Sequence, residues 1–285
     1  MISLPRSIYG FVLHLAKIIW DGFNVVVLRK VPLVYFDGVL NAGDQLNVDV
    51  FEWVTGRKTY NSKSRVFKHF LGVGSILFYA NERSVIWGSG FIDENTPRGM
   101  LKFNKVIALR GELSRQALDK KNKYKFDGPL GDPALLMPSI FNPEVEKKYR
   151  VGIVPHYAQQ EFLASISSSC GDDIKIIDIK TSGKEFIKDL LECEVIISSS
   201  LHGLILSDAY GIKNCWVQLQ NGINGGQFKF RDYYSTTSCE RPEAMSINNQ
   251  EELAKLLKNI NDVASVKEYK GDLSSLVSVI QQEFK

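Results

Sequence analysis

Apolar residues along the chain gather in short runs that alternate with one-sided helical stripes. Runs that are apolar at consecutive positions are typical of strands buried on both faces of a parallel sheet. These runs predict strands at 32–36, 75–80, 84–87 and 105–109 in the first half, and at 150–154, 174–179, 194–198 and 215–219 in the second. The pattern therefore predicts a chain built from repeated βα units.

Helical stripes fall between the predicted strands. Leu46, Val50 and Val54 recur at intervals of four residues, and a second stripe is centred on Phe186 and Leu190. Such spacing places apolar side chains on one face of a helix. The two stretches near the end, NQEELAKLLKNI and DLSSLVSVIQQEF, also have a helical pattern.

The stretch LMPSIFNPEVEKKYR combines two prolines with a charge cluster, which is typical of a domain boundary. We place the boundary at 138–148. We expect an N-terminal α/β domain at 1–140, a C-terminal α/β domain at 149–265, and a helix within 266–285 that packs back on the first domain. The predicted fold is α/β, with two Rossmann-like domains that face a central cleft.

Composition excludes some classes of protein. The 285 residues carry 35 basic and 32 acidic side chains, a formal charge of +3, and the basic residues are not interleaved with aromatics as in a nucleic-acid groove. We therefore expect no nucleic-acid partner. The four cysteines, Cys170, Cys193, Cys215 and Cys239, show no CxxC or metal-like spacing, which predicts buried thiols, no disulfide and no metal site.

An apolar tract runs from residue 8 to residue 36. It is interrupted by His14, Lys17, Asp21, Asn24, Arg29 and Lys30. We expect these residues to break the tract before it reaches the roughly 20 residues that a bilayer requires. The tract then predicts neither a transmembrane helix nor a signal peptide, but an amphipathic helix followed by a buried strand. The alternative is a helix on a membrane surface, with Arg6, Lys17, Arg29 and Lys30 near lipid head groups.

Polar residues at strand-to-helix turns are the main candidates for chemistry, because ligands of open parallel sheets bind beyond the carboxyl ends of the strands. Five turns qualify: Asn41-Ala42-Gly43-Asp44, Trp87-Gly88-Ser89-Gly90-Phe91, Arg110-Gly111-Glu112, Gly131-Asp132-Pro133-Ala134, and the serines Ser198, Ser199 and Ser200 before His202. The alternatives are structural: helix caps and turns, a lone GxG without dinucleotide spacing, and an ion pair of Arg110 with Glu112 or Asp132.

The fifth turn carries the sharpest prediction. Its strand runs into a helix that starts near Leu201 and ends at Gly211. Serine hydroxyls and free backbone N–H groups at a helix start form a ready anion site that needs no metal. His202 lies in the first turn, where the helix dipole disfavours imidazolium unless a bound anion offsets it.

The other histidines and one further segment complete the candidates. His14 belongs to an apolar helix, and His69 fits a solvated helix edge. His156 follows the strand at 151–154 at the cleft end, where a ligand contact and an ordinary polar residue both remain open. After the glycine-rich loop at 221–226, Lys229 and Arg231 suit an anionic ligand, with a charged surface turn as the alternative.

In this order, the motifs NAGDQLN, WGSGF, RGELSR, GDPALL, GIVPHY, SSSLHGLILSDAYG and KFRDYY resemble the polysaccharide pyruvyl transferase family, especially members that build pyruvylated bacterial exopolysaccharides. The resemblance spans residues 41–234. It implies a fold similar to two-domain B-type glycosyltransferases. It also implies a reaction in which phosphoenolpyruvate forms a cyclic ketal with two hydroxyls of one sugar and releases phosphate.

The resemblance also assigns roles to residues. It implies that His202, Arg110 and Asp44 are catalytic, with His202 as general acid or base. Together with the anion site, the rim histidine and the cations predicted above, it places in the donor site Arg110, Ser198, Ser199, Ser200, His202, Gly203, Lys229, Arg231 and His156. The acceptor side and cleft are implied to include Asn41, Gly43, Asp44, Gly88, Ser89, Gly90 and Asp232. No metal and no cofactor beyond the donor substrate are expected.

One position departs from the family pattern, and it keeps two rival functions open. Many members have Arg-Leu-His where this chain has Ser200-Leu201-His202, so more of the phosphate charge falls to Arg110 and Lys229. One rival is a B-type glycosyltransferase that uses a nucleotide sugar; the other is a non-catalytic glycan-binding subunit. The resemblance further implies a glycan or lipid-linked oligosaccharide acceptor and a cytoplasmic location, with a peripheral contact to the inner membrane as an open alternative.

Overall fold

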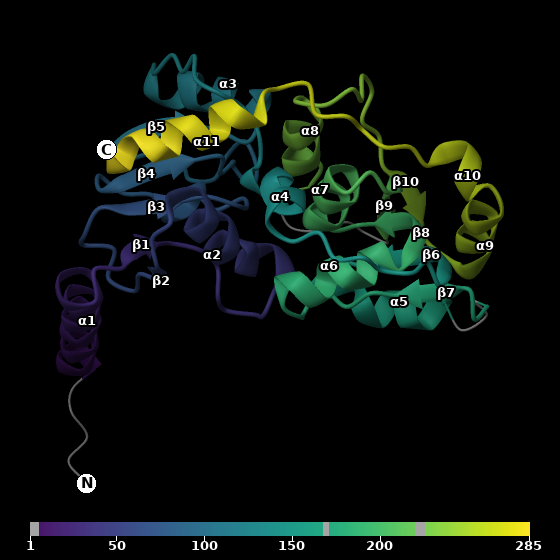
Figure 1. Cartoon of the computed structure of the whole chain (residues 1–285), viewed down its shortest axis with the longest axis horizontal. Helices are drawn as coiled ribbons and strands as arrows, with labels where there is room; N and C mark the ends of the chain where they lie inside the picture. Colours follow the sequence, from purple (N-terminus) through teal and green to yellow (C-terminus); the bar gives the residue numbers. More distant parts are fainter. Residues whose placement is uncertain (1–5, 168–170, 220–225) are drawn as a thin grey trace, which may run out of the picture.

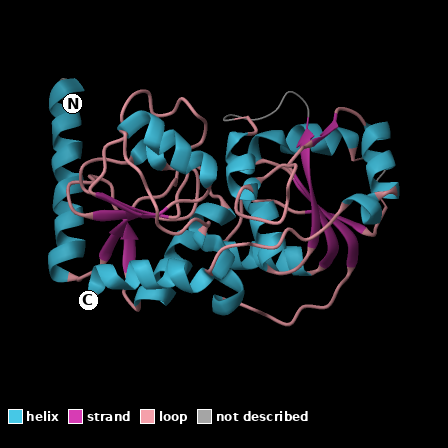
Figure 2. Cartoon of the chain, turned by 90° about the horizontal axis from the view of Figure 1, so that it is seen from above, coloured by secondary structure: helices cyan, strands magenta, loops and turns pink. Residues whose placement is uncertain are grey.

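The computed structural model describes residues 6–167, 171–219 and 226–285, and its strands form two five-stranded parallel sheets (Figure 1). The first sheet has the order β2-β1-β3-β4-β5 and the second has the order β10-β9-β8-β6-β7. Figure 2 shows the two sheets side by side along the molecule, each flanked by helices. The predicted fold class, α/β with two Rossmann-like units, is confirmed.

The strands of the first sheet are β1 (Val31–Leu33), β2 (Thr59–Asn61), β3 (His69–Leu71), β4 (Ser84–Trp87) and β5 (Lys105–Ala108). Those of the second are β6 (Tyr149–Val154), β7 (Ile174–Ile176), β8 (Cys193–Ser198), β9 (Lys213–Leu219) and β10 (Met245–Ile247). All the pairings within both sheets are parallel. The carboxyl ends of the strands therefore share one edge in each sheet.

The α-helices are α1 (Arg6–Gly22), α2 (Ala42–Thr55), α3 (Glu112–Asn122), α4 (Met137–Ile140), α5 (Gln160–Ile166), α6 (Gly183–Leu191), α7 (Leu201–Ala209), α8 (Phe228–Tyr234), α9 (Gln250–Lys258), α10 (Ile260–Val263) and α11 (Leu273–Gln281). The 3₁₀ turns are η2 (Leu77–Tyr79), η3 (Pro133–Leu136), η4 (Tyr157–Gln159) and η5 (Gln282–Phe284), and η1 (Phe23–Val27) is a π-helical segment. Residues 141–148, between α4 and β6, form neither helix nor strand.

Two local predictions for the first sheet are wrong. The predicted strand at 75–80 is a loop followed by η2, and the true strand is the preceding β3. His69, expected on a solvated helix edge, is fully buried in β3, with Nε2 2.7 Å from Ser84 Oγ and Nδ1 2.9 Å from Phe67 O. The pattern misled because a three-residue strand is too short to show a period of its own.

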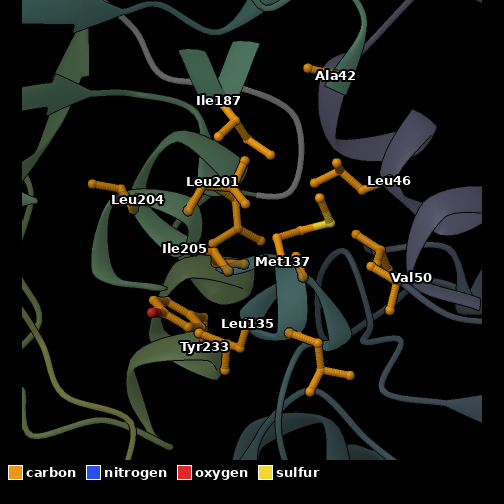
Figure 3. Close-up of a cluster of buried hydrophobic side chains, with 14 of the residues drawn as sticks. Ala42, Leu46, Val50, Leu135, Met137, Ile187, Leu201, Leu204, Ile205 and Tyr233 are labelled. Carbon is orange, nitrogen blue, oxygen red and sulfur yellow. The ribbon is translucent and has the colours of Figure 1, made fainter. Parts of the chain in front are cut away.

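The two halves share a hydrophobic core (Figure 3). Its labelled members are Ala42, Leu46, Val50, Leu135, Met137, Ile187, Leu201, Leu204, Ile205 and Tyr233. These side chains come from α2, η3 and α4 on one side and from α6, α7 and α8 on the other. The backbone N–H of Ala42 donates to Ile179 O across the junction at 2.8 Å. This packing brings the carboxyl edges of the two sheets toward each other.

Helix α11 crosses from the second half and lies on the first sheet (Figure 1). Trp87 Nε1 donates to Leu276 O at 2.8 Å, and Gln281 Nε2 donates to Val54 O at 3.1 Å. The carboxylate of Glu283 accepts from Lys68 at 2.8 Å and from Lys105 at 2.6 Å. These contacts attach the end of the chain to the first sheet.

Helix α1 stands at the end of the molecule that lies farthest from the second sheet (Figures 1 and 2). Together with η1 it gives a 19-residue apolar stretch, Tyr9–Val27, with a mean hydropathy of 1.4 and 11% of it buried. By length and composition alone this stretch can cross a membrane, so the expectation that polar residues leave too short a span is corrected. Lys17 and Asp21 are its only charged residues, and they do not end the helix.

The structure describes three of the four cysteines. Cys193 and Cys215 are buried free thiols, and Cys239 is partly buried. Burial raises the pKa of both buried thiols to about 12. Cys170 lies outside the described residues.

Candidate active site

A cavity of about 210 Å³ lies between the carboxyl edges of the two sheets. The first half lines it with Phe36, Asn41, Asp44, Gly74, Ser75, Ile76, Phe78 and Ile92, and the second half with His156, Tyr157, Ser200, Leu201, His202 and Lys229. Six of these fourteen were predicted from the sequence: Asn41, Asp44, His156, Ser200, His202 and Lys229. The cavity is where the strand-to-helix turns of a parallel sheet are expected to bind a ligand.

The first predicted turn forms the start of α2. Asn41 Oδ1 accepts from the Gly43 backbone N–H at 3.0 Å, so Asn41 caps the helix. A Cβ on Gly43 would collide with the imidazole of His202, so the turn allows α2 and the start of α7 to approach closely. Asp44 follows in the first helical turn and is 8% exposed.

The serines of the fifth turn divide into two groups. Ser198 Oγ accepts from the Ser200 backbone N–H at 3.0 Å and donates to Ser200 O at 2.8 Å. Ser199 Oγ donates to Gln159 Oε1 at 2.8 Å and accepts from the His156 backbone N–H at 2.9 Å. Both hydroxyls therefore hold the turn together, and Ser200 alone among the three lines the cavity.

His202 is a buried polar group in the lining of the cavity. The side chain is 9% exposed, and its buried Nε2 has no hydrogen-bond partner among the described residues. Burial, together with the charges of Arg110 and Lys229, lowers the pKa of His202 to about 3. The ring is therefore neutral at physiological pH, and an anion bound nearby would offset the two cations.

Lys229 and Asp44 place opposite charges in the same cavity. Lys229 is 8% exposed and forms no ion pair within the described parts of the chain. Burial and the charge of Arg110 lower the pKa of Lys229, Asp44 opposes the shift, and the resulting pKa is about 8. Burial raises the pKa of Asp44 to about 7, with Lys229 opposing. Both groups are thus poised to change protonation near neutrality.

His156 lies at the rim beyond β6. Its Nδ1 accepts from the Ala158 backbone N–H at 3.3 Å, and its ring lies against Tyr157 with the centroids 4.3 Å apart. Burial, together with the charge of Lys229, lowers the pKa of His156 to about 4. The ring is therefore a neutral polar group beside the lysine.

Arg110 and Asp232 form a fully buried ion pair behind the cavity wall. Arg110 Nε and Nη2 both lie 2.8 Å from Asp232 Oδ2, and Nη2 also donates to Phe91 O at 2.7 Å. The partner is neither Glu112 nor Asp132, the two that the sequence suggested. Arg110 does not line the cavity itself, but its Nη1 donates to Ser75 Oγ, and Ser75 does. A direct contact of Arg110 with a donor stays a prediction.

The remaining predicted site residues lie around the cavity rather than in its lining. Ser89 Oγ donates to Gly74 O at 2.9 Å, and a Cβ on Gly90 would collide with the Arg110 guanidinium. Gly88 has a φ of +81° and packs against Pro133. Gly203 packs against Ser198, and exposed Arg231 binds Gln227 Oε1 at 2.7 Å. Of the predicted loop at 221–226, residues 221–225 lie outside the described residues.

The sequence interpretation missed the loop that follows β3. Gly74, Ser75, Ile76 and Phe78 form much of the apolar wall of the cavity. The signal was the GVGS stretch, two glycines and a serine after an apolar run, but the run was assigned to the wrong segment. No group of three His, Cys, Asp or Glu side chains suited to a metal ion was found among the described residues.

The fold and cavity define an α/β protein with two parallel sheets and a polar site between their carboxyl edges. Its sequence matches the profile of the polysaccharide pyruvyl transferase family over residues 7–221, and the chain belongs to this family, as its motifs predicted.

Two curated relatives are similar over most of the chain. An uncharacterized protein of Acanthamoeba polyphaga mimivirus is 30% identical over 75% of this chain and 77% of its own length. The succinoglycan biosynthesis protein ExoV of Rhizobium meliloti is 26% identical over 74% of this chain and 66% of its own length. Among solved structures, a functionally uncharacterized protein of Klebsiella pneumoniae is 12% identical, with a TM-score of 0.44, and covers 86% of this chain and all of its own.

Proposed function

We propose that the protein transfers pyruvate from phosphoenolpyruvate to two hydroxyls of one sugar in a surface polysaccharide or its lipid-linked precursor. The product is a cyclic ketal, and phosphate is released. Family membership and the similarity to a succinoglycan biosynthesis protein support this class of reaction. The observation that carries the proposal is the unpartnered Nε2 of His202, which shares one cavity with Lys229 and Asp44.

The charges of the cavity suit this donor. Phosphoenolpyruvate carries a phosphate and a carboxylate, and Lys229 offers a buried cation without an ion-pair partner in the described residues. Ser200 and the backbone N–H groups at the start of α7 supply donors to an anion. Lys229 compensates in part for the cation missing at position 200, because Lys229 and Ser200 line the same cavity.

The two titratable groups suit opposite proton transfers. Neutral His202 accepts a proton from the attacking sugar hydroxyl through Nε2, which has no hydrogen-bond partner among the described residues. Asp44, which keeps its proton up to about pH 7, donates one to the methylene carbon of the donor. The hydroxyl then forms its bond to the central carbon. The second hydroxyl displaces phosphate and closes the ketal.

The roles of the two halves follow from this scheme. The first half, through Asn41, Asp44 and the loop after β3, forms the acceptor side of the cavity. The second half, through the α7 start and Lys229, forms the donor side. We propose that the fold is similar to that of B-type glycosyltransferases and that the reaction uses no cofactor beyond the donor substrate. We also propose that the protein is cytoplasmic and lies at the inner face of the membrane. The oligomeric state is left open.

Incubation of the protein with phosphoenolpyruvate and a candidate glycan is expected to add one pyruvate, less one water, to the glycan mass and to release phosphate. Mass spectrometry and a coupled phosphate assay measure the two products. In a parallel thermal-shift panel, phosphoenolpyruvate should raise the melting temperature, because binding to the native state stabilises it. If only a nucleotide sugar raised the melting temperature, the protein would be assigned as a glycosyltransferase. If no glycan led to the release of phosphate, it would be assigned as a non-catalytic binding subunit.

The pH dependence of kcat/KM is expected to fall above about pH 7. The raised pKa of Asp44 means that its acid form is present below about pH 7 and is lost as the pH rises through that value. Asp44→Asn should lower the rate and remove this alkaline limb. Lys229, with a pKa of about 8, titrates nearby, so Lys229→Arg serves as the control. If the fall in kcat/KM at alkaline pH remained in Asp44→Asn but disappeared in Lys229→Arg, the titrating group would be Lys229 and not Asp44.

A further inference from the structure

Helix α1 and the segment after it expose apolar side chains over most of their surface. These residues are Tyr9, Phe11, Val12, Leu13, Leu15, Ile19, Trp20, Phe23, Val26, Val27 and Leu28. Phe11 is 67% exposed, Ile19 63% and Val26 71%. A contiguous exposed apolar surface of this extent marks an interaction site.

Four polar residues of α1 and η1 lie along a single line. His14, Lys17, Asp21 and Asn24 follow at spacings of three, four and three residues, which places them on one side of a helix. Asp21 and Asn24 are buried against the body of the protein, whereas His14 and Lys17 are exposed. A polar line on one side and apolar side chains on the other make the helix amphipathic, as a helix that lies in a membrane interface must be.

The end of α1 is attached firmly to the first sheet. The fully buried carboxylate of Asp21 accepts from Ser62 Oγ at 2.7 Å, Ser64 Oγ at 2.5 Å and the Ser64 backbone N–H at 2.9 Å. Tyr60 OH donates to Asp21 O at 3.3 Å. These bonds fix the position of the helix end relative to the segment that immediately follows Ser64.

That segment borders a second cavity, of about 640 Å³, at the amino-terminal ends of β3, β4 and β5. It is lined by Ser64, Arg65, Val66, Lys68, Asn81, Glu82, Arg83 and Asn104. Lys68, Arg83 and Asn104 directly precede the three strands. Since the strands are parallel, this edge of the sheet is opposite to the edge that carries the candidate active site.

The second cavity carries more positive than negative charge. The lining includes three cations, Arg65, Lys68 and Arg83, and one carboxylate, Glu82. Glu82 forms an ion pair with Lys102 at 2.7 Å. Lys68 binds Glu283, and Arg65 Nη1 donates to Tyr79 O at 3.0 Å. The side chain of Arg83 is exposed and forms no ion pair among the described residues. Arg29 and Lys30 add two cations just after the apolar stretch.

We infer that α1 inserts its apolar face into the interface of an anionic lipid bilayer while the cationic amino-terminal edge of the first sheet binds the lipid phosphates. Apolar area and basic residues together give stable attachment, because each basic residue near such a surface adds to the attraction. Held this way, the active-site cavity faces away from the bilayer. This inference deepens the proposed location at the membrane by naming the residues that attach the protein, and it does not depend on the proposed reaction.

Flotation of the full chain with lipid vesicles tests the inference without any substrate, so its outcome is independent of the proposed activity. We expect binding to vesicles of phosphatidylcholine with phosphatidylglycerol, weaker binding to phosphatidylcholine alone, and a loss of the difference at high salt. The double variant Phe11→Glu/Ile19→Glu should weaken binding about 100-fold or more, since two large apolar side chains leave the lipid. Arg83→Glu should weaken binding to anionic vesicles about 5-fold or more.

Matched controls carry the same changes in the second half. Val263→Glu alters an apolar residue that is 41% exposed, and Lys258→Glu alters an exposed cation of α9, so both should bind as the wild type does. Two results together would overturn the inference: the wild type does not bind vesicles, and it forms dimers that the variant Phe11→Glu/Ile19→Glu dissociates. They would show that α1 packs against a second copy of the chain. Resistance to alkaline extraction would overturn the interfacial arrangement in favour of a helix that crosses the bilayer.

Discussion

Replacing His202 with alanine is expected to lower the rate of pyruvyl transfer by about 10²- to 10⁴-fold, the usual contribution of a positioned general acid or base. The unpartnered Nε2 of His202 is the only imidazole nitrogen among the described residues that is buried without a hydrogen bond. Burying such a group costs free energy unless a ligand supplies the missing hydrogen bond. The rate is measured with phosphoenolpyruvate and glycan at saturation, after circular dichroism has shown that the variant is folded.

A second variant separates position from chemistry. Gly43→Ala keeps the imidazole but adds a methyl group that would collide with it, so the ring must move and the rate should fall as well. Gly10→Ala is the matched control, because a Cβ there meets nothing within 4 Å. Full turnover by His202→Ala would remove this residue from the mechanism, and full turnover by Gly43→Ala would show that the placement of the ring is not critical.

Replacing Asp232 with alanine is expected to lower the free energy of unfolding by about 3–5 kcal/mol. The change leaves the Arg110 guanidinium fully buried without its counter-ion. It also removes the acceptor of the Ser114 backbone N–H at 2.7 Å and of Ser114 Oγ at 2.6 Å. Because Asp232 belongs to α8 and Arg110 follows β5, the loss falls on the contact between the two halves. Urea unfolding measures it.

The adjacent position provides the control for this experiment. Arg231→Ala removes an exposed cation from the same helix and should change the stability by no more than about 0.5 kcal/mol. The double variant Arg110→Met/Asp232→Leu should recover most of the loss, since replacing both ions of a buried pair removes the unpaired charge. If Asp232→Ala lowered stability no more than Arg231→Ala, the ion pair would not hold the halves together.

The sequence determined the class of the protein and the region of its site. Apolar runs gave the βα units because a strand buried on both faces must be apolar at consecutive positions. Asn41, Asp44, His156, Ser200, His202 and Lys229 were found because a parallel sheet places its strand-to-helix turns on one edge. The short strand β3 was not predicted, because three residues are too few to show the two-residue hydrophobic period of a strand.

Only the tertiary structure decided which polar groups are free. Ser198 and Ser199 look like anion ligands in the sequence, yet their hydroxyls bind within their own turn and to Gln159. Arg110 looks like a free cation, yet it is paired with Asp232, 122 positions away. The packing of α8 on the first half brings Asp232 to Arg110. Because the two residues are far apart in the chain, no local sequence pattern predicts their pairing. The sequence therefore specified the groups of the site. Packing decided that, within the part of the chain that the structure describes, His202 Nε2 has no hydrogen-bond partner and Lys229 has no ion-pair partner.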